Sequence, residues 1–158
     1  MFSLNIQRTI PHGSESGNLT DQLRTVHQEI KAWHPAIDRM AIALYDATSG
    51  MLRTFASSSN DSDPLEHYEV PLSQVPSLAN LAQTSKMRVI GDMDKVFTGN
   101  SHHTLWLKRH GYRSSLTVPV HESGGKGKLA AFFFFNSRQV NAFGRRLNGA
   151  RQATCRLN

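Results

Sequence analysis

The feature that most constrains this sequence is a run of seven consecutive apolar residues at 129–135. Neighbouring side chains of a β-strand point to opposite faces of the sheet, so a strand of this composition must be covered on both faces. Before it come a strand-like segment at 111–120 and a glycine-rich segment at 124–128 with the composition of a turn. These residues predict an antiparallel hairpin whose second strand lies at the centre of a sheet.

An earlier part of the chain has the same organisation. Residues 39–45 and 51–57 are strand-like, and the turn-forming residues 46–50 join them. Helical sequence separates this hairpin from the second one. The chain therefore predicts an α+β fold, in which helices pack on an antiparallel sheet.

The order of helix, hairpin, connecting helices and hairpin resembles that of the GAF family of small-molecule sensor domains. The second hairpin also follows the family pattern S-x-L-x-V-P-[apolar]. The resemblance covers residues 19–147 and implies a central antiparallel sheet of about five to six strands. It places the N- and C-terminal helices on one face and the connecting helices and loops on the other. The residues that match the family pattern are Ser114, Leu116, Val118, Pro119 and Val120.

Two terminal segments predict amphipathic helices. The first begins with Asn18 as its N-cap and ends at His34, because the residue before a proline is pushed out of the helical conformation. The second begins near Val140. In both, apolar residues recur at spacings of four and three, and Trp33 is the last of the first stripe. Such a stripe packs on the protein's own sheet or on a second copy, and the predicted dimer interface comprises Leu19, Leu23, Val26, Ile30, Phe143 and Leu147.

The chain of 158 residues has the length of one domain. Residues 1–17 predict a flexible lead-in, residues 18–147 the GAF-like domain, and residues 148–158 a C-terminal helical extension that leads toward an output domain. Between the hairpins the sequence predicts a polar loop at 57–64, an edge strand within 66–72, a helix from Pro76, a strand at 87–90 and a helix at 102–110.

Charge and composition indicate which partners and which cellular compartment to expect. The net charge is +6, but residues 123–158 carry seven basic side chains and no acidic one, so the rest is balanced. Without a nucleic-acid-binding motif, this basic segment does not predict a nucleic-acid partner. No apolar run approaches the length of a membrane span, and the single cysteine, Cys155, fits a reducing compartment. We expect a cytoplasmic protein.

Candidate catalytic and metal-ligating residues do not form a recognisable motif. His103 and His110 lie two turns apart on the predicted helix, about 10 Å along its axis, which is too far for one ion. Ser114 and Ser115 lie inside a predicted strand rather than at the exposed strand-to-helix turn of a nucleophilic serine. The sequence predicts no metal site and no catalytic residue. The cofactor stays open, because some GAF sensors hold haem or non-haem iron.

Three functions known in the GAF family depend on particular residues, and this sequence can be compared with those requirements. Bilin attachment and the methionine sulfoxide reductase activity of GAF proteins both need cysteines in the body of the domain, whereas Cys155 follows the last predicted strand. The cyclic-nucleotide signature of the family is missing too, since Lys95-Val96-Phe97 is not followed by an acidic pair. The resemblance therefore supports none of these three functions.

The resemblance places a ligand over one face of the sheet, beneath the connecting helices. Arg113 stands out there, because a buried charge at the start of a strand must meet an acidic side chain or an anionic ligand. An arginine exposed at the strand end is the alternative. The ligand-binding residues predicted in this way are Tyr45, Phe55, His103, Trp106, Arg113, Ser115 and Phe133.

The leading hypothesis is a non-enzymatic bacterial sensory domain. It binds an unknown small molecule, forms a homodimer through its terminal helices, or does both, and relays the change to an output domain outside this sequence. By analogy with the family, that output is an HD-GYP, GGDEF, histidine kinase or transcription-factor module. The alternatives are a pure dimerisation module without a ligand and a redox or hydrolytic enzyme on the same scaffold.

Overall fold

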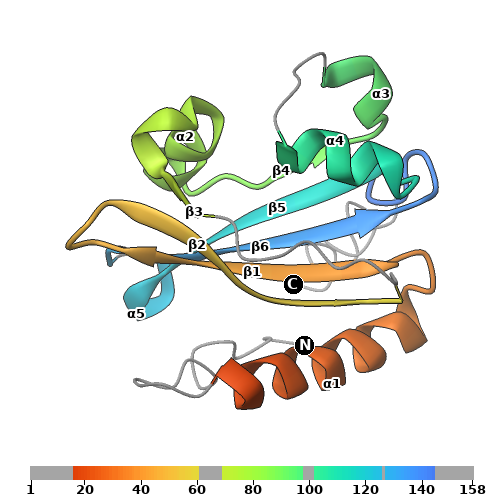
Figure 1. Ribbon diagram of the computed structural model, residues 1–158, viewed down its shortest axis with the longest axis horizontal. Helices are drawn as coiled ribbons and strands as arrows, with labels where there is room; N and C mark the ends of the chain where they lie inside the picture. The colour runs from red at the N-terminus through yellow and green to blue at the C-terminus, as the bar shows by residue number, and fades with distance from the viewer. Residues whose placement is uncertain (1–15, 61–68, 98–101, 126, 145–158) are drawn as a thin grey trace, which may run out of the picture.

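The computed structural model describes residues 16–60, 69–97, 102–125 and 127–144. Figure 1 shows three layers, with one long helix beneath a sheet and the connecting helices above it. The sheet has six strands in the order β3-β2-β1-β6-β5-β4, and every neighbouring pair is antiparallel. The predicted α+β class and the predicted sheet are both confirmed.

Most elements fall where the sequence predicts them. The strands are β1 (Arg39–Asp46), β2 (Met51–Ser59), β3 (Glu69–Pro71), β4 (Arg88–Ile90), β5 (Ser114–His121) and β6 (Leu129–Ser137). The helices are α1 (Ser16–Trp33), α2 (Pro76–Thr84), α3 (Met93–Val96), α4 (His102–Arg109) and α5 (Glu122–Gly125), with a 3-10 turn at Leu72–Gln74.

The apolar strand β6 is central, as predicted. It lies between β1 and β5, and its side chains enter the cores on both sides of the sheet. Phe132 packs with Leu78 and Leu81 of α2, whereas Phe133 packs with Leu19 and Leu23 of α1. Each face of this strand is therefore closed by helices from a different part of the chain.

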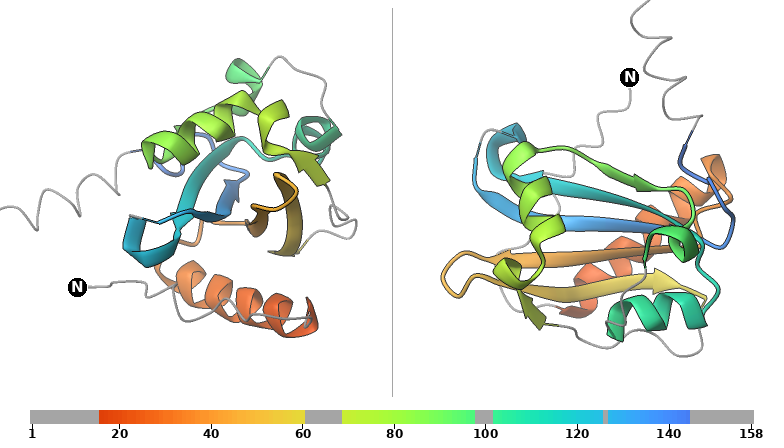
Figure 2. Two further views of the ribbon diagram at one scale, coloured as in Figure 1. Left: turned by 90° about the vertical axis from the view of Figure 1, so that its left-hand side faces the viewer. Right: turned by 90° about the horizontal axis from the view of Figure 1, so that it is seen from above.

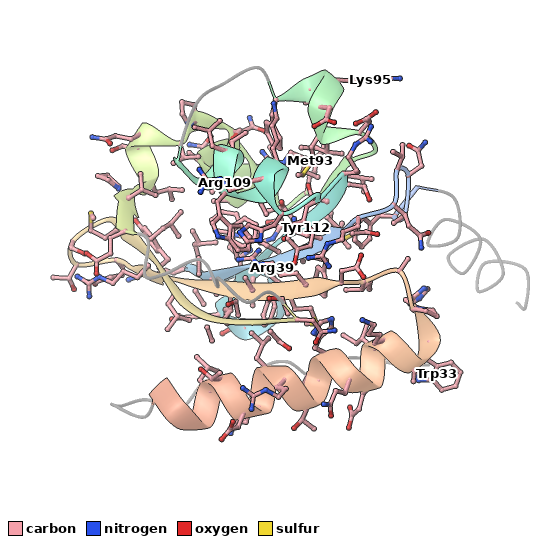
Figure 3. The ribbon with its side chains drawn as sticks, turned by 45° about the vertical axis from the view of Figure 1, so that its right-hand side comes forward. Trp33, Arg39, Met93, Lys95, Arg109 and Tyr112 are labelled. Atoms are coloured by element: carbon pink, nitrogen blue, oxygen red, sulfur yellow. The ribbon has the colours of Figure 1, made fainter. Side chains whose placement is uncertain are left out.

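Helix α1 packs along β1 and β2 on the lower face of the sheet (Figure 2). Leu19 and Leu23 are buried there, and Val26 and Ile30 pack against the same core. Of the two alternatives for this stripe, packing on the protein's own sheet is therefore what the structure shows. The stripe ends before Trp33, which is 77% exposed and projects from the end of the helix (Figure 3).

Two predicted boundaries at the N-terminal side are corrected. Helix α1 begins at Ser16, so Asn18 lies inside it and is not its cap, whereas residues 1–15 lie outside the described part. The predicted polar loop at 57–64 starts too early, because β2 continues to Ser59 and pairs with β1. Ser58 is buried and its hydroxyl lies 2.8 Å from Nδ1 of His27, which compensates for its polarity.

The helix predicted from Val140 is also corrected over its described part. Residues 140–143 form a turn, and Asn141 has a positive φ of 58°. The amide of Asn141 donates to the carbonyl of Gly91 at 2.8 Å, so a contact with a distant loop, rather than helical periodicity, sets this backbone. Phe143 is buried in the lower core beside α1, whereas Leu147 lies outside the described residues.

Candidate functional site

The upper face of the sheet carries charged and amide side chains, whereas the buried polar side chains on the described strands of the lower face are the serines Ser58, Ser114 and Ser137. Strand pairing places Arg39, Asn136 and Ser115 in one row across β1, β6 and β5. The adjacent row ends in Thr117 and Arg88 on β5 and β4. We call these five residues the polar rows. All of them are buried except Arg88, which is half-buried.

Two separate apolar clusters stand on either side of the polar rows. The α4 cluster consists of Ile90, Met93, Trp106, Leu107 and Tyr112, and the core of the α2 cluster consists of Leu52, Leu78, Leu81 and Phe132. Helices α2 and α4 lie over opposite ends of the strands (Figures 1 and 2). A concentration of hydrogen-bonding groups between two apolar walls is the composition expected of a small-molecule site.

Arg39 is the most deeply buried charge on this face, with 1% of its surface exposed. Its Nη1 donates to Oδ1 of Asn136 at 2.7 Å, and its guanidinium carbon lies 5.2 Å from the centre of the Trp106 ring. Figure 3 shows its position at the sheet, beneath the part of the structure that carries Tyr112. An arginine here is tolerated because an amide oxygen and an aromatic face replace part of its hydration.

Trp106 connects α4 to the polar rows. Its ring stacks on His110 at 4.3 Å and lies 6.0 Å from the ring of Tyr112. The indole is buried, so it shields Arg39 from water and raises the strength of electrostatic interactions beneath it. Trp106 is one of the predicted ligand-binding residues, and its ring lies on the upper face beside Arg39.

Arg88 stands at the other side of the polar rows, on the edge strand β4. Its Nη2 donates to Oγ1 of Thr117 at 3.3 Å, and its guanidinium carbon lies 5.9 Å from the centre of the Phe97 ring. Burial lowers the pKa of the Arg88 guanidinium from its ordinary value. The Nε atom of Arg88 is buried and has no hydrogen-bond partner. Nearby, Nζ of Lys108 donates to the carbonyl of Phe97 at 2.6 Å.

Arg113 meets acidic side chains, which was one of the two partners predicted for it. Its Nη2 lies 3.1 Å from Oδ2 of Asp92, and its Nε lies 3.2 Å from Oδ2 of Asp94. Partial burial raises the pKa of Asp92, but hydrogen bonds from Arg113 and the Asp94 amide, with the charges of Arg113 and Lys95, outweigh it and leave the pKa lowered. This pair joins α3 to the start of β5 and is separate from the polar rows.

The other predicted ligand-binding residues divide between the two faces. Ser115 lies in the polar rows, and Tyr45 shares their face but packs against the α2 cluster. The prediction for Phe133 is corrected, because its side chain enters the lower core with α1. Alternation along β6 sends Phe132 and Phe133 to opposite faces. The side chains of Phe55 and His103 lie outside the described part.

Sequence reasoning missed Arg39, Arg88 and Asn136. The signal for Arg39 was present, since it is a charged residue at the start of a strand whose next five residues are apolar. Arg88 and Asn136 carried no such signal, because a three-residue strand and the last residues of a longer one show too little alternation to assign a face.

Within the described ranges, no group of three or more histidine, cysteine, aspartate or glutamate side chains is placed to hold a metal ion. Within the same ranges, no helix is both long and apolar enough to cross a bilayer.

Comparisons with known proteins identify the fold. No protein-family model and no curated protein sequence matches the chain. Among solved structures, it is similar to the type II free methionine-R-sulfoxide reductase of Thermoplasma acidophilum, with 16% identity and a TM-score of 0.59 over 85% of this chain and 84% of that chain.

Two GAF domains are similar to the same extent. The phycocyanobilin-bound GAF domain of a cyanobacterial phytochrome has 18% identity and a TM-score of 0.60, over 95% of this chain and 83% of that chain. The GAF domain of a two-component sensor histidine kinase from Bacillus halodurans has 16% identity and a TM-score of 0.60, over 87% and 89%. The chain has the GAF fold.

Proposed function

We propose that this protein is a non-enzymatic sensory domain that binds a small molecule on the upper face of its sheet. The observation that carries the proposal is the set of polar rows, buried between the α2 and α4 clusters. Burying polar groups costs stability unless they are hydrogen-bonded, and the lower face shows that this sheet can close mainly with apolar side chains. Two structurally similar proteins are a bilin-bound domain and a domain of a sensor kinase, which is consistent with this role.

A path for relaying the signal runs from this face to the end of the described chain. The amide of Met93 in α3 donates to the carbonyl of Arg113, just before β5. The hydroxyl of Ser114 donates to the carbonyl of Gln139 at 2.5 Å, and the Asn141 amide bonds to Gly91. A ligand that favours one arrangement of α3 and α4 would thereby shift the population of arrangements of residues 139–144. The proposed receiver is an output domain or a second copy of this chain.

Native mass spectrometry of the freshly purified protein tests the proposal. We expect extra mass that is released on denaturation, and we expect Thr117→Val to reduce its occupancy while the circular dichroism spectrum stays unchanged. Arg53→Gln is the matched control, because Arg53 is exposed and pairs with Glu69 away from the polar rows. Repeated preparations without extra mass, together with no thermal stabilisation by any member of a metabolite library, would contradict the proposal.

The second candidate is an enzyme on this scaffold, and the similarity to the Thermoplasma reductase is what favours it. The only cysteine of the chain is Cys155, which lies outside the described residues. A thiol-dependent reductase should lose its activity in Cys155→Ser. Assay of free methionine-R-sulfoxide reduction by both proteins therefore separates the enzyme from the sensor.

Homodimerisation is a further proposal, as part of the sensor or as a dimerisation module without a ligand. Sedimentation of the wild-type protein and of Trp33→Glu tests whether the chain dimerises and whether the end of α1 takes part. Trp33 is exposed, so we expect its replacement to leave the lower core intact. A dimer that dissociates in this variant would place the interface at the end of α1.

A further inference from the structure

We infer that the ligand of the upper face is an anion, and that its carboxylate or phosphate oxygens bind at Arg88 and Thr117. This inference rests on the proposed function and adds the chemical class of the ligand.

Arg88 differs from the arginines that form ion pairs. Ion pairs join Arg24 to Asp21, Arg53 to Glu69, and Arg113 to Asp92 and Asp94. Arg88 is more buried than the exposed Arg24 and Arg53, yet it belongs to none of these pairs. A half-buried guanidinium without a carboxylate loses hydration and gains no opposite charge in return.

The guanidinium of Arg88 has unused hydrogen-bonding capacity. A guanidinium presents five N–H donors in a planar fork that matches the oxygens of a carboxylate or a phosphate. One Nη2 hydrogen is used on Oγ1 of Thr117, whereas the Nε hydrogen has no partner. Thr117 accepts from Arg88, so its own hydroxyl hydrogen is available to a bound oxygen. Together the two side chains offer donors from adjacent strands and no acceptor of full negative charge.

Other positively charged side chains lie on the same side of the sheet as Arg88. Lys108 approaches from α4 and donates to the carbonyl of Phe97, the residue whose ring lies beside Arg88. Arg39 projects on the same face of the sheet, from β1, and is held by Asn136. Three cations thus contribute positive potential to one face in a region where burial reduces screening by solvent. A neutral ligand would leave that potential uncompensated.

The test is an NMR titration of the full chain, labelled with ¹⁵N, that follows the arginine Nε–Hε signals. Sodium phosphate and sodium succinate are added in separate experiments, with sodium chloride used to hold the ionic strength constant. We expect a saturable shift of the Arg88 signal, and the more potent of the two salts identifies phosphate or carboxylate as the ligand group. Arg88→Gln should weaken binding about tenfold or more, and Thr117→Val by a smaller factor. Arg53→Gln should leave binding unchanged.

The outcomes separate the inference from the proposed function. A linear shift shared by the Arg24 and Arg53 signals, or no shift at Arg88 in either salt, would overturn the anion inference. If native mass spectrometry then still finds a neutral or cationic ligand, the sensory function stands and only its ligand class changes. The titration of the wild-type protein alone decides these cases, so the inference stays testable even if Arg88→Gln does not fold.

Discussion

The two faces of the sheet differ in what they bury. The lower face closes on α1 with aliphatic and aromatic side chains, such as Ile42, Leu116 and Phe133. The upper face buries Arg39, Thr117 and other polar groups between two apolar clusters that do not merge. One sheet therefore has a face organised for stability and a face that gives up apolar contact in favour of hydrogen-bonding groups. That division is expected where a site is built on a rigid scaffold.

A cavity in the lower face should cause the largest loss of stability. Phe133→Ala removes a ring that packs with Leu19, Leu23 and Ile42, and we expect a loss of about 3–5 kcal/mol in the free energy of unfolding. Urea denaturation followed by circular dichroism measures it. The matched change on the upper face is Phe134→Ala, whose ring is only partly buried. An equal or larger loss for Phe134→Ala would contradict the division between the faces.

A smaller effect is expected from the polar rows. Asn136→Leu removes the oxygen that accepts from Nη1 of Arg39 and leaves a buried charge with one hydrogen bond fewer. We expect a loss of about 1.5–3 kcal/mol, because hydrogen bonds to charged groups are stronger than neutral ones. Asn136→Asp is the informative companion, since it places a carboxylate beside the arginine. If Asn136→Leu is as stable as the wild-type protein, the polar pair does not hold the upper face together.

A substitution of Arg88 should affect stability and binding in opposite directions. Arg88→Met keeps the aliphatic stem beside Phe97 and removes a half-buried charge without an acidic partner. We expect the free protein to gain about 0.5–1 kcal/mol, as is common when a functional charge is removed. Phosphate and succinate binding should be lost in the same variant. A less stable Arg88→Met protein would mean that this arginine supports the fold.

The smallest effect concerns pH. The folded protein lowers the pKa of Asp92, so the unfolded chain binds more protons than the folded one as the medium becomes acidic. The contribution of Asp92 is therefore fully present above its ordinary pKa of about 4 and is lost as pH falls through the lower, folded pKa. Thermal melting of wild type and Asp92→Asn between about pH 2 and pH 7 measures this, and the variant should show the shallower acid limb. Identical limbs would contradict it.

Several features of the fold were predictable from local sequence. The apolar run at 129–135 required a covered, central strand, and β6 is that strand. Pro76 and Gly111 marked the start of α2 and the end of α4, because proline suits a first helical turn and Gly111 adopts a φ of 78°. These residues act through neighbours in the chain, so their effect can be read without knowing the fold.

The candidate site was predictable only in part. Trp106 and Ser115 lie on the face of the proposed site, whereas Phe133 lies on the opposite face and Arg39, Arg88 and Asn136 were not predicted. In a strand that is apolar on both sides, a shift of one residue exchanges its faces, and the sequence of 129–135 holds no polar residue to mark them. Pairing with β1 and β5 decides the matter, because it aligns Asn136 with Arg39 and Ser115.

Two hairpins with helices between them follow from local sequence, since turn residues, caps and strand composition act over a few positions. Which arginine is neutralised depends instead on tertiary packing. Arg113 meets Asp92 and Asp94, which are about twenty residues away in the chain, while Arg88 meets Thr117 and Phe97 and no carboxylate among the described ion pairs. Charge compensation depends on distance in space, and for these residues the packing of α3, β4 and β5 sets that distance.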